Sequence, residues 1–161
     1  MITNVKNGTS KNVQKINKKG MILTTRTTAR QQMVLAIGAF PNSKKPNCID
    51  QGDLVLLYNS ELNLFYAQAT YVGTCEFRTL PFDELGYLRN KYPNAYDENW
   101  KHRIFLDDIV VFENPFTLED LNNVATKKLK KHGYTIKLQG NIMYIEDADI
   151  PLLNSEFGVK I

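Results

Sequence analysis

The sequence predicts an α+β domain in which a small mixed or antiparallel β-barrel is flanked by short helices. Three observations support this class. The chain has 161 residues, of which 43% are apolar and 23% charged, which suits one globular domain with its own core. Its segments follow the order strands, helix, strand, helix, strand, helix, and connections of hairpin length dominate. Several strands are partly apolar on both faces, which favours closure into a barrel.

A basic arm is expected to precede the domain. Residues 1–20 contain five lysines, no acidic residue and many Asn, Thr and Gly residues. Because such a segment cannot bury enough apolar surface to offset its ordering entropy, we expect a flexible arm, followed by a single domain over residues 21–161. Residues 21–40 begin like a strand, pass through a polar patch and end in VLAIGAF, which fits a buried strand and a buried helical turn alike.

A β-hairpin is the clearest predicted element. LVLLYNS at 54–60 and LFYAQATYVGTCEF at 64–77 are rich in aliphatic and aromatic residues, and the polar tip at 61–63 has hairpin spacing. The next periodic segment predicts a helix over 82–92, which Pro93 ends.

The second half of the chain alternates strands and helices. RIFLDDIVVF at 103–112 predicts a strand, and its neighbouring acids Asp107 and Asp108 are expected on opposite faces. TLED at 117–120 predicts a capping box that starts a short helix.

The end of the chain predicts one or two short strands and then a helix. YTIKLQGNIMYI at 134–145 has strand composition, interrupted by a Gln-Gly-Asn turn. DADIPLLNSEFG at 147–158 has a proline in its first turn and a glycine at its end, as a helix start and stop require.

Several classes of protein are disfavoured. No stretch approaches the roughly 20 apolar residues that span a bilayer, so no membrane partner is expected. Cys48 and Cys75 lie far apart without C-x-x-C spacing, which favours a reducing, cytoplasmic location. Glycine-rich phosphate loops, a nucleophile elbow and zinc-ligand spacing around His102 or His132 are lacking, so neither a cofactor nor a metal is predicted. Spacing alone leaves a Cys–His nucleophile pair open.

Two lysine clusters are candidate phosphate-binding groups. The first closes the arm with Lys18 and Lys19, and the second consists of Lys127, Lys128, Lys130 and Lys131. Clustered lysines bind the nucleic-acid backbone, although a solvated surface explains such clusters equally well.

Aromatic and amide side chains indicate base binding. Tyr58, Asn59 and Ser60 stand where a buried strand ends, and aromatic faces with a few hydrogen-bonding groups can hold a flipped base. Trp100, in the loop before the strand at 103–112, is a second candidate for stacking. Alternatively, Trp100 caps the end of the barrel against the helix at 82–92.

Four segments resemble the EVE domain family. They are GDLVLLYNS, YAQATYVGTCEF, RIFLDDIVVFENPFTLEDL and KLQGNIMYIEDADIPLLNSEFG, which stand in the family's order and lie within residues 50–158. The EVE family is grouped with YTH and PUA domains, so the resemblance implies a PUA-like barrel that takes a modified base into an aromatic-walled pocket.

The resemblance also implies site residues. Tyr58, Asn59 and Ser60 match the strand-end triplet beside the family's pocket. The family's opening tryptophan-containing strand is not matched, and ILTTRTTARQQM stands in its place. From their location in this segment, Arg26, Thr27 and Arg30 are predicted to replace that part of the pocket wall.

The leading hypothesis is a non-enzymatic domain that recognises a modified base in DNA or RNA. One alternative is a metal-dependent nuclease or RNA-modifying enzyme that uses Asp107, Asp108 or Glu113, because hard metals prefer carboxylates. Another is a protein-interaction module. The oligomeric state is left open.

Overall fold

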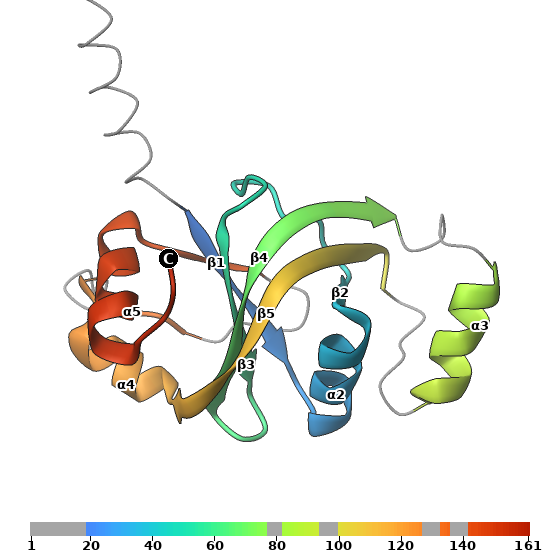
Figure 1. Ribbon diagram of the computed structural model, residues 1–161, viewed down its shortest axis with the longest axis horizontal. Helices are drawn as coiled ribbons and strands as arrows, with labels where there is room; N and C mark the ends of the chain where they lie inside the picture. The colour runs from blue at the N-terminus through green and yellow to red at the C-terminus, as the bar shows by residue number, and fades with distance from the viewer. Residues whose placement is uncertain (1–18, 77–81, 94–99, 127–132, 136–141) are drawn as a thin grey trace, which may run out of the picture.

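The computed structural model describes residues 19–76, 82–93, 100–126, 133–135 and 142–161. In this part of the chain, six strands form one curled sheet in the order β2-β5-β4-β3-β1-β6. Figure 1 shows α4 and α5 at one end of this sheet, and α2 and α3 at the other. All pairs of neighbouring strands are antiparallel except β1 and β3, which are parallel. The sheet is therefore mixed.

The elements have the following bounds. The strands are β1 (Gly20–Thr25), β2 (Ala39–Asn42), β3 (Leu54–Asn59), β4 (Leu64–Glu76), β5 (His102–Phe116) and β6 (Met143–Ile145). The helices are α2 (Thr28–Ile37), α3 (Phe82–Lys91), α4 (Leu118–Val124), the short 3-10 turn η3 (Asp147–Asp149) and α5 (Ile150–Phe157). The predicted hairpin, the helix at 82–92 and the closing helix are confirmed.

The ambiguous segment at 21–40 divides into strand, helix and strand. Thr27 is the N-cap of α2, because its side chain accepts a hydrogen bond from the Arg30 backbone N–H at 3.1 Å. Gly38 ends the helix with a φ of 66°, a left-handed conformation that favours glycine. VLAIGAF is thus part helix and part strand. The helix carries the chain across the sheet, so that β1 can lie parallel to β3.

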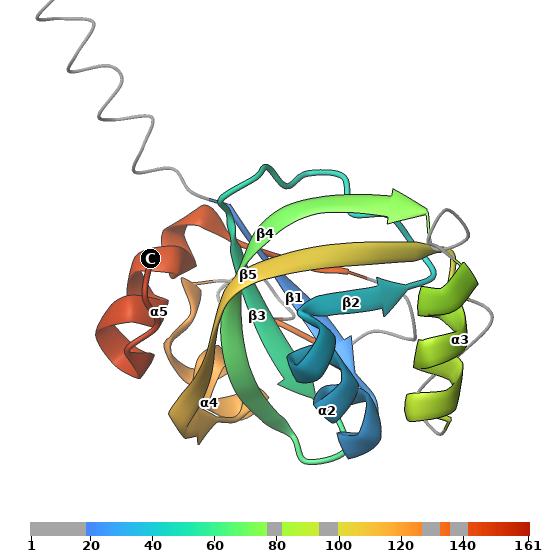
Figure 2. The ribbon, with the colours of Figure 1, turned by 45° about the vertical axis from the view of Figure 1, so that its right-hand side comes forward.

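Two apolar clusters occupy the two faces of the sheet. Cluster one contains Ile22, Leu56 and Phe65 and packs against α5, whereas cluster two contains Leu23, Leu57 and Val34 of α2. Successive side chains of a strand point to opposite faces, so β1 and β3 each contribute to both clusters. Figure 2 shows α5 at the left end of the curled sheet and α2 in front of the sheet, below β2.

The strand β5 does not follow regular alternation at its two acids. The pairing of β4 with β5 shifts register between Gln68 and Thr70, opposite Val110 and Asp107. At this irregularity Asp108 has a φ of 49°, and both Asp107 and Asp108 are exposed. The prediction that they face opposite sides of a regular strand does not apply, because a bulge interrupts the alternation.

The ends of the two C-terminal helices follow the predicted signals. Thr117 accepts from the Asp120 backbone N–H at 3.0 Å while the Asp120 carboxylate accepts from the Thr117 N–H at 2.9 Å, which confirms the capping box of α4. Gly158 caps α5 with a φ of 69°. Within the described residues, none of the helices reaches the length and hydrophobicity needed to cross a bilayer.

The C-terminal residues are held to the sheet by one buried amide. The Gln68 side chain donates to the Lys160 carbonyl at 2.7 Å and accepts from the Lys160 N–H at 2.8 Å. Gln68 therefore acts as an additional peptide group for the tail, and its amide is not available to a ligand.

Candidate functional site

A group of polar side chains lies where β1 and β3 end beneath α2. We call it the polar cluster, and it consists of Thr25, Gln31, Asn59 and Tyr66. Thr25 and Asn59 are partners in the parallel register, so their backbones are adjacent. The exposed fractions of Thr25, Asn59 and Tyr66 are 1%, 0% and 4%, whereas Gln31 is half-buried. The cluster is thus buried at its base and reaches solvent at Gln31.

Asn59 anchors the cluster to the hairpin turn. Its Oδ1 accepts from the Leu62 backbone N–H at 3.0 Å, and its Nδ2 donates to Oε1 of Gln31 at 2.7 Å. Because a backbone N–H can only donate, the first bond fixes Asn59 Oδ1 as the acceptor. The second bond then fixes Gln31 Oε1 as an acceptor, so Gln31 Nε2 is the donor end of that amide and takes no part in this bond.

The second half of the cluster is a pair of hydroxyls. Thr25 Oγ1 and Tyr66 Oη lie 2.8 Å apart, and either atom can donate. Burial raises the pKa of Tyr66 above its ordinary value, although the hydrogen bond with Thr25 opposes the shift. The tyrosine is therefore neutral at physiological pH. The Thr25 and Tyr66 hydroxyls carry two hydrogens in total, and one of the two lies in the bond between them.

Arg26 and Ser60 form the exposed rim of the cluster. Arg26 follows β1 directly, and both of these side chains are exposed. The Ser60 N–H donates to the Thr25 carbonyl at 2.9 Å, which extends the parallel pairing by one residue. Two exposed residues, Arg26 and Ser60, thus follow directly after the strand ends that carry Thr25 and Asn59.

The first turn of α2 is occupied by a carboxylate from the hairpin tip. Glu61 Oε1 accepts from the Thr28 N–H at 3.2 Å and from Thr28 Oγ1 at 2.8 Å. A helix N-terminus attracts anions, so Glu61 stands where a phosphate would otherwise be favoured. This arrangement favours a neutral ligand group, rather than a phosphate, at that end of α2.

The structure does not bring Tyr58 together with Asn59. Tyr58 is 3% exposed, belongs to cluster one and donates its hydroxyl to Asn63. Asn59 faces α2 on the other side of the sheet, because consecutive residues of a strand point in opposite directions. Ser60 lies beyond the strand and is exposed. The strand-end triplet is therefore divided between a core tyrosine, a buried amide and a rim serine.

Trp100 packs against the helix at 82–91, as its alternative interpretation predicts. It is 7% exposed and packs with Met33 of α2 and Leu88 of α3 in a third apolar cluster. The Arg30 guanidinium lies over the indole, with its Cζ 5.0 Å from the ring centroid. Arg30 and Trp100 are thus near each other, and the indole is covered by helices rather than open for stacking.

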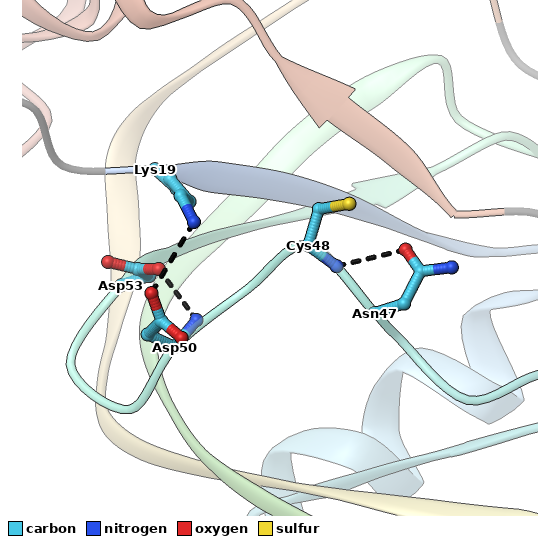
Figure 3. Close-up of polar contacts among 5 residues, drawn as sticks. All are labelled: Lys19, Asn47, Cys48, Asp50 and Asp53. Atoms are coloured by element: carbon cyan, nitrogen blue, oxygen red, sulfur yellow. Dashed lines mark hydrogen bonds and ion pairs between the residues drawn. The ribbon is translucent and has the colours of Figure 1, made fainter.

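Of the six predicted phosphate-binding lysines, the structure describes only Lys19. Its ammonium lies 3.4 Å from Oδ2 of Asp50, and both side chains are largely exposed (Figure 3). In the same loop, the Asp50 backbone N–H donates to Asp53 Oδ2 at 2.7 Å. Lys19 therefore lies just before β1, beside acidic neighbours that compete with a phosphate. The remaining predicted lysines, Lys18, Lys127, Lys128, Lys130 and Lys131, lie outside the described residues.

Asp107, Asp108 and Glu113, which the metal-dependent enzyme hypothesis requires, do not form a metal-binding group within the described residues. Asp107, Asp108 and Glu113 are exposed along β5. Across the residues that the structure describes, three His, Cys, Asp or Glu side chains are nowhere grouped closely enough to hold a metal ion. Asp107 instead accepts from the Asp108 backbone N–H at 2.9 Å.

Sequence reasoning missed three members of the polar cluster as site residues. Thr25, Gln31 and Tyr66 lie in segments with clear polar or aromatic character, yet their meeting depends on the parallel pairing of β1 with β3. Alternation along β4 does correctly place Tyr66 and Phe65 on opposite faces of the sheet. The helix that brings Gln31 over the strand ends has no comparable sequence signal, because its apolar and polar faces are weakly separated.

Comparisons with known proteins identify the fold. No family model matches the sequence, and no curated protein matches it. The ASCH structure from Zymomonas mobilis aligns with a TM-score of 0.61 at 12% identity, over 85% of this chain and 94% of that chain. The YTH domain of the Zygosaccharomyces rouxii MRB1 protein, solved in complex with N6-methyladenosine RNA, aligns with a TM-score of 0.57 at 10% identity, over 87% and 86%.

These neighbours confirm the predicted fold class. ASCH and YTH domains are both PUA-like, and the chain shares their mixed, curled sheet with flanking helices. At such low identity the likeness concerns the fold alone. It does not distinguish the EVE family from other proteins that share this fold.

Proposed function

We propose that this chain binds nucleic acid and takes one base, modified in its natural ligand, into contact with the polar cluster. One observation carries the proposal: buried amides and hydroxyls meet at the ends of β1 and β3 and continue to a half-exposed donor, Gln31. Buried polar groups that are held in place by their neighbours can recognise a base edge without reorganising.

Charge and fold add support to this proposal. Arg26 is exposed and directly follows Thr25 of the polar cluster in the chain, and its guanidinium can donate to a phosphate or a base edge. The chain carries a net charge of +3, which favours association with a polyanion. Among proteins of this fold, the YTH neighbour was solved with a methylated RNA, so the architecture is compatible with such a ligand.

The assignment to the EVE family and the absence of catalysis belong to the same proposal. The EVE assignment rests on the four sequence segments within residues 50–158. The polar cluster consists of amides and hydroxyls, which suit recognition, and the proposal therefore concerns binding. Cleavage or chemical change of the bound oligonucleotide would contradict it.

The test is a binding panel measured by fluorescence anisotropy. Single-stranded RNA, single-stranded DNA and duplex DNA would be compared, each unmodified or carrying methylcytosine, hydroxymethylcytosine or methyladenine at one position. We expect at least one member to bind at low salt and to weaken as salt rises, because each neutralised phosphate releases counterions.

A matched pair of variants tests the location of the interface. Arg26→Gln and Lys160→Gln remove the same charge from exposed side chains, and Arg26 directly follows Thr25 of the polar cluster in the chain whereas Lys160 adjoins none of its residues in sequence. We expect Arg26→Gln to weaken binding more than Lys160→Gln does. Equal losses would place the interface elsewhere, and no binding to any oligonucleotide would reject the proposed function.

A further inference from the structure

The second half of β5 has a hydrogen-bonded strand on one side only. β4 pairs with β5 between His102 and Phe116, whereas β2 pairs with it only from His102 to Phe105. The Leu106 N–H still donates to the Gly38 carbonyl at 3.0 Å, and among the described residues no later residue of β5 makes a backbone bond on that side. The residues after Leu106 therefore form a sheet edge, where backbone N–H and C=O groups are available to another strand.

Two features set the ends of the usable edge. At its start, Asp108 has a φ of 49° in a bulge, which interrupts the regular alternation of the strand. Near its end, Pro115 has no N–H to donate. We call residues 109–114 the open edge. A strand of about six residues is usual in globular proteins, so one more strand fits between the bulge and the proline.

The open edge is anchored to the core and still exposes two large apolar side chains. Ile109 packs against cluster two and Phe112 against cluster one, which holds the strand between both faces of the sheet. Val110 and Val111 are 37% and 56% exposed. Because consecutive side chains point to opposite faces, each face offers one valine to a neighbouring strand.

The acids beside these valines show what kind of strand the open edge accepts. Asp107, Asp108 and Glu113 are exposed, and residues 106–116 include no lysine or arginine. Within the described part of the chain, none of the three carboxylates is in an ion pair. If two copies of the open edge paired with each other, acids would lie near acids in either strand orientation, which is unfavourable. A strand with basic side chains is favoured instead.

We propose that the open edge binds an extended segment of another protein, in which lysines or arginines flank one or two apolar residues. The segment adds to the sheet as a strand beside β5, and its backbone forms the hydrogen bonds that the edge leaves open. Its apolar side chains lie beside Val110 and Val111, and its basic side chains pair with the three acids. The polar cluster draws no residue from β5, so this binding does not depend on the proposed function.

Peptides of opposite charge test the basic character of the partner. The full chain would be titrated against a fluorescein-labelled hexapeptide of alternating lysine and valine with blocked ends, and against the same peptide with glutamate in place of lysine. We expect the lysine peptide to bind about tenfold more tightly or better, because opposite charges attract across a strand pair and like charges repel. Equal affinities, or no binding of either peptide, would overturn the proposal.

A methylated peptide separates strand addition from simple charge attraction. Methylation of every backbone nitrogen in the lysine peptide keeps its charges and its valines, and it removes every N–H that could pair with β5. We expect this form to bind about tenfold more weakly or worse, the effect of one to three net hydrogen bonds. If it binds as tightly as the unmodified peptide, strand addition is wrong.

A matched pair of variants locates the peptide on the open edge. Glu113→Lys and Glu156→Lys make the same charge change at exposed side chains, the first on the edge and the second on α5. We expect Glu113→Lys to weaken the lysine peptide about twofold to fivefold more than Glu156→Lys does. Equal effects would place the peptide elsewhere. The peptide comparisons use the wild-type protein and decide the outcome even where a variant does not fold.

Sedimentation of the protein alone tests the competing occupant, a second copy of the chain. We expect Val111→Lys to sediment as the wild type does, because the acids of two open edges repel each other. A wild-type dimer that Val111→Lys dissociates would show that a second copy occupies the edge and would overturn the proposal. The oligonucleotide panel tests the proposed function separately, so either can fail while the other stands.

Discussion

Asn59 is the residue on which most of the polar cluster depends. It is completely buried, yet both ends of its amide are hydrogen-bonded, one to the hairpin turn and one to α2. A buried amide is tolerated in a core only when such partners are present. The same bonds join the tip of the β3–β4 hairpin to the first turns of the helix, so one side chain organises the hairpin and orients Gln31.

Replacing Asn59 by alanine should therefore destabilise the fold. The Leu62 N–H and Gln31 Oε1 each lose a partner, and a typical intramolecular hydrogen bond contributes about 0.5–1.5 kcal/mol. Urea denaturation would measure the loss as a lower midpoint. Ser60→Ala is the control, since that side chain is exposed and should change stability by less than about 0.5 kcal/mol. Equal midpoints for Asn59→Ala and the wild type would show that the bonds contribute nothing.

At the scale of elements, a small apolar cluster and an ion pair attach α3 to its neighbours within the described residues. Leu88 of α3 packs with Met33 and Trp100, and Glu84 of α3 pairs with Arg103 of β5. Arg103 is itself 8% exposed and its Nε is buried without a hydrogen-bond partner, so the pair is only partly satisfied. The indole of Trp100 therefore contributes much of the apolar surface that joins α2 to α3.

This arrangement predicts that substitutions of Trp100 lower the stability of the fold as their primary effect, rather than oligonucleotide binding. Trp100→Ala leaves a cavity between α2 and α3 and should lower the free energy of unfolding by about 3–5 kcal/mol, whereas Trp100→Phe should lower it by less. Thermal denaturation followed by circular dichroism would measure both variants, because Trp100 is the protein's one tryptophan and its fluorescence is lost. A fully stable Trp100→Ala variant with weakened oligonucleotide binding would restore the stacking interpretation.

At the scale of the whole molecule, buried hydroxyls join distant parts of the chain. The Tyr134 hydroxyl donates to Asp149 at 2.7 Å, and Asp149, which is completely buried, also accepts from the Thr126 N–H and Oγ1 at 2.6 Å. These bonds connect Thr126, two residues after the end of α4, to Asp149 of η3, just before α5. On the other face, Tyr66 connects β4 to the end of β1 through Thr25.

These tyrosines predict a loss of stability at alkaline pH. Burial raises the pKa of Tyr66 and of Tyr134, and the hydrogen bond to Asp149 raises that of Tyr134 further. The folded state therefore keeps both phenols neutral, while the unfolded chain releases their protons above pH of about 10. Stability from this source is complete below that pH and decreases above it, because the unfolded state then binds fewer protons.

The alkaline prediction is measured by the urea midpoint across that pH range. We expect the midpoint to fall above pH of about 10, and tyrosinate absorbance of the folded protein to stay below that of the eight ionised tyrosines of the unfolded chain. Tyr66→Phe should reduce the slope of the fall, although it also removes the bond to Thr25. Complete ionisation of all tyrosines in the folded protein would contradict the prediction.

The sequence by itself determined the local elements of this protein. The hairpin at 54–77, the capping box at Thr117 and the proline-to-glycine helix at 150–158 follow from turn chemistry and periodicity, which act between neighbouring residues. Such signals do not depend on the remainder of the fold. They also identified Asn59 as a polar residue at the end of a buried strand, although they did not identify its partners.

Only the tertiary structure decided which residues meet. The crossover of α2 makes β1 parallel to β3, and this pairing brings Thr25 beside Asn59 and places Gln31 above both. Strand alternation then separates Tyr58 from Asn59, and helix packing covers Trp100. These contacts join residues far apart in the chain, and their stability comes from apolar burial between whole elements, which no local pattern specifies.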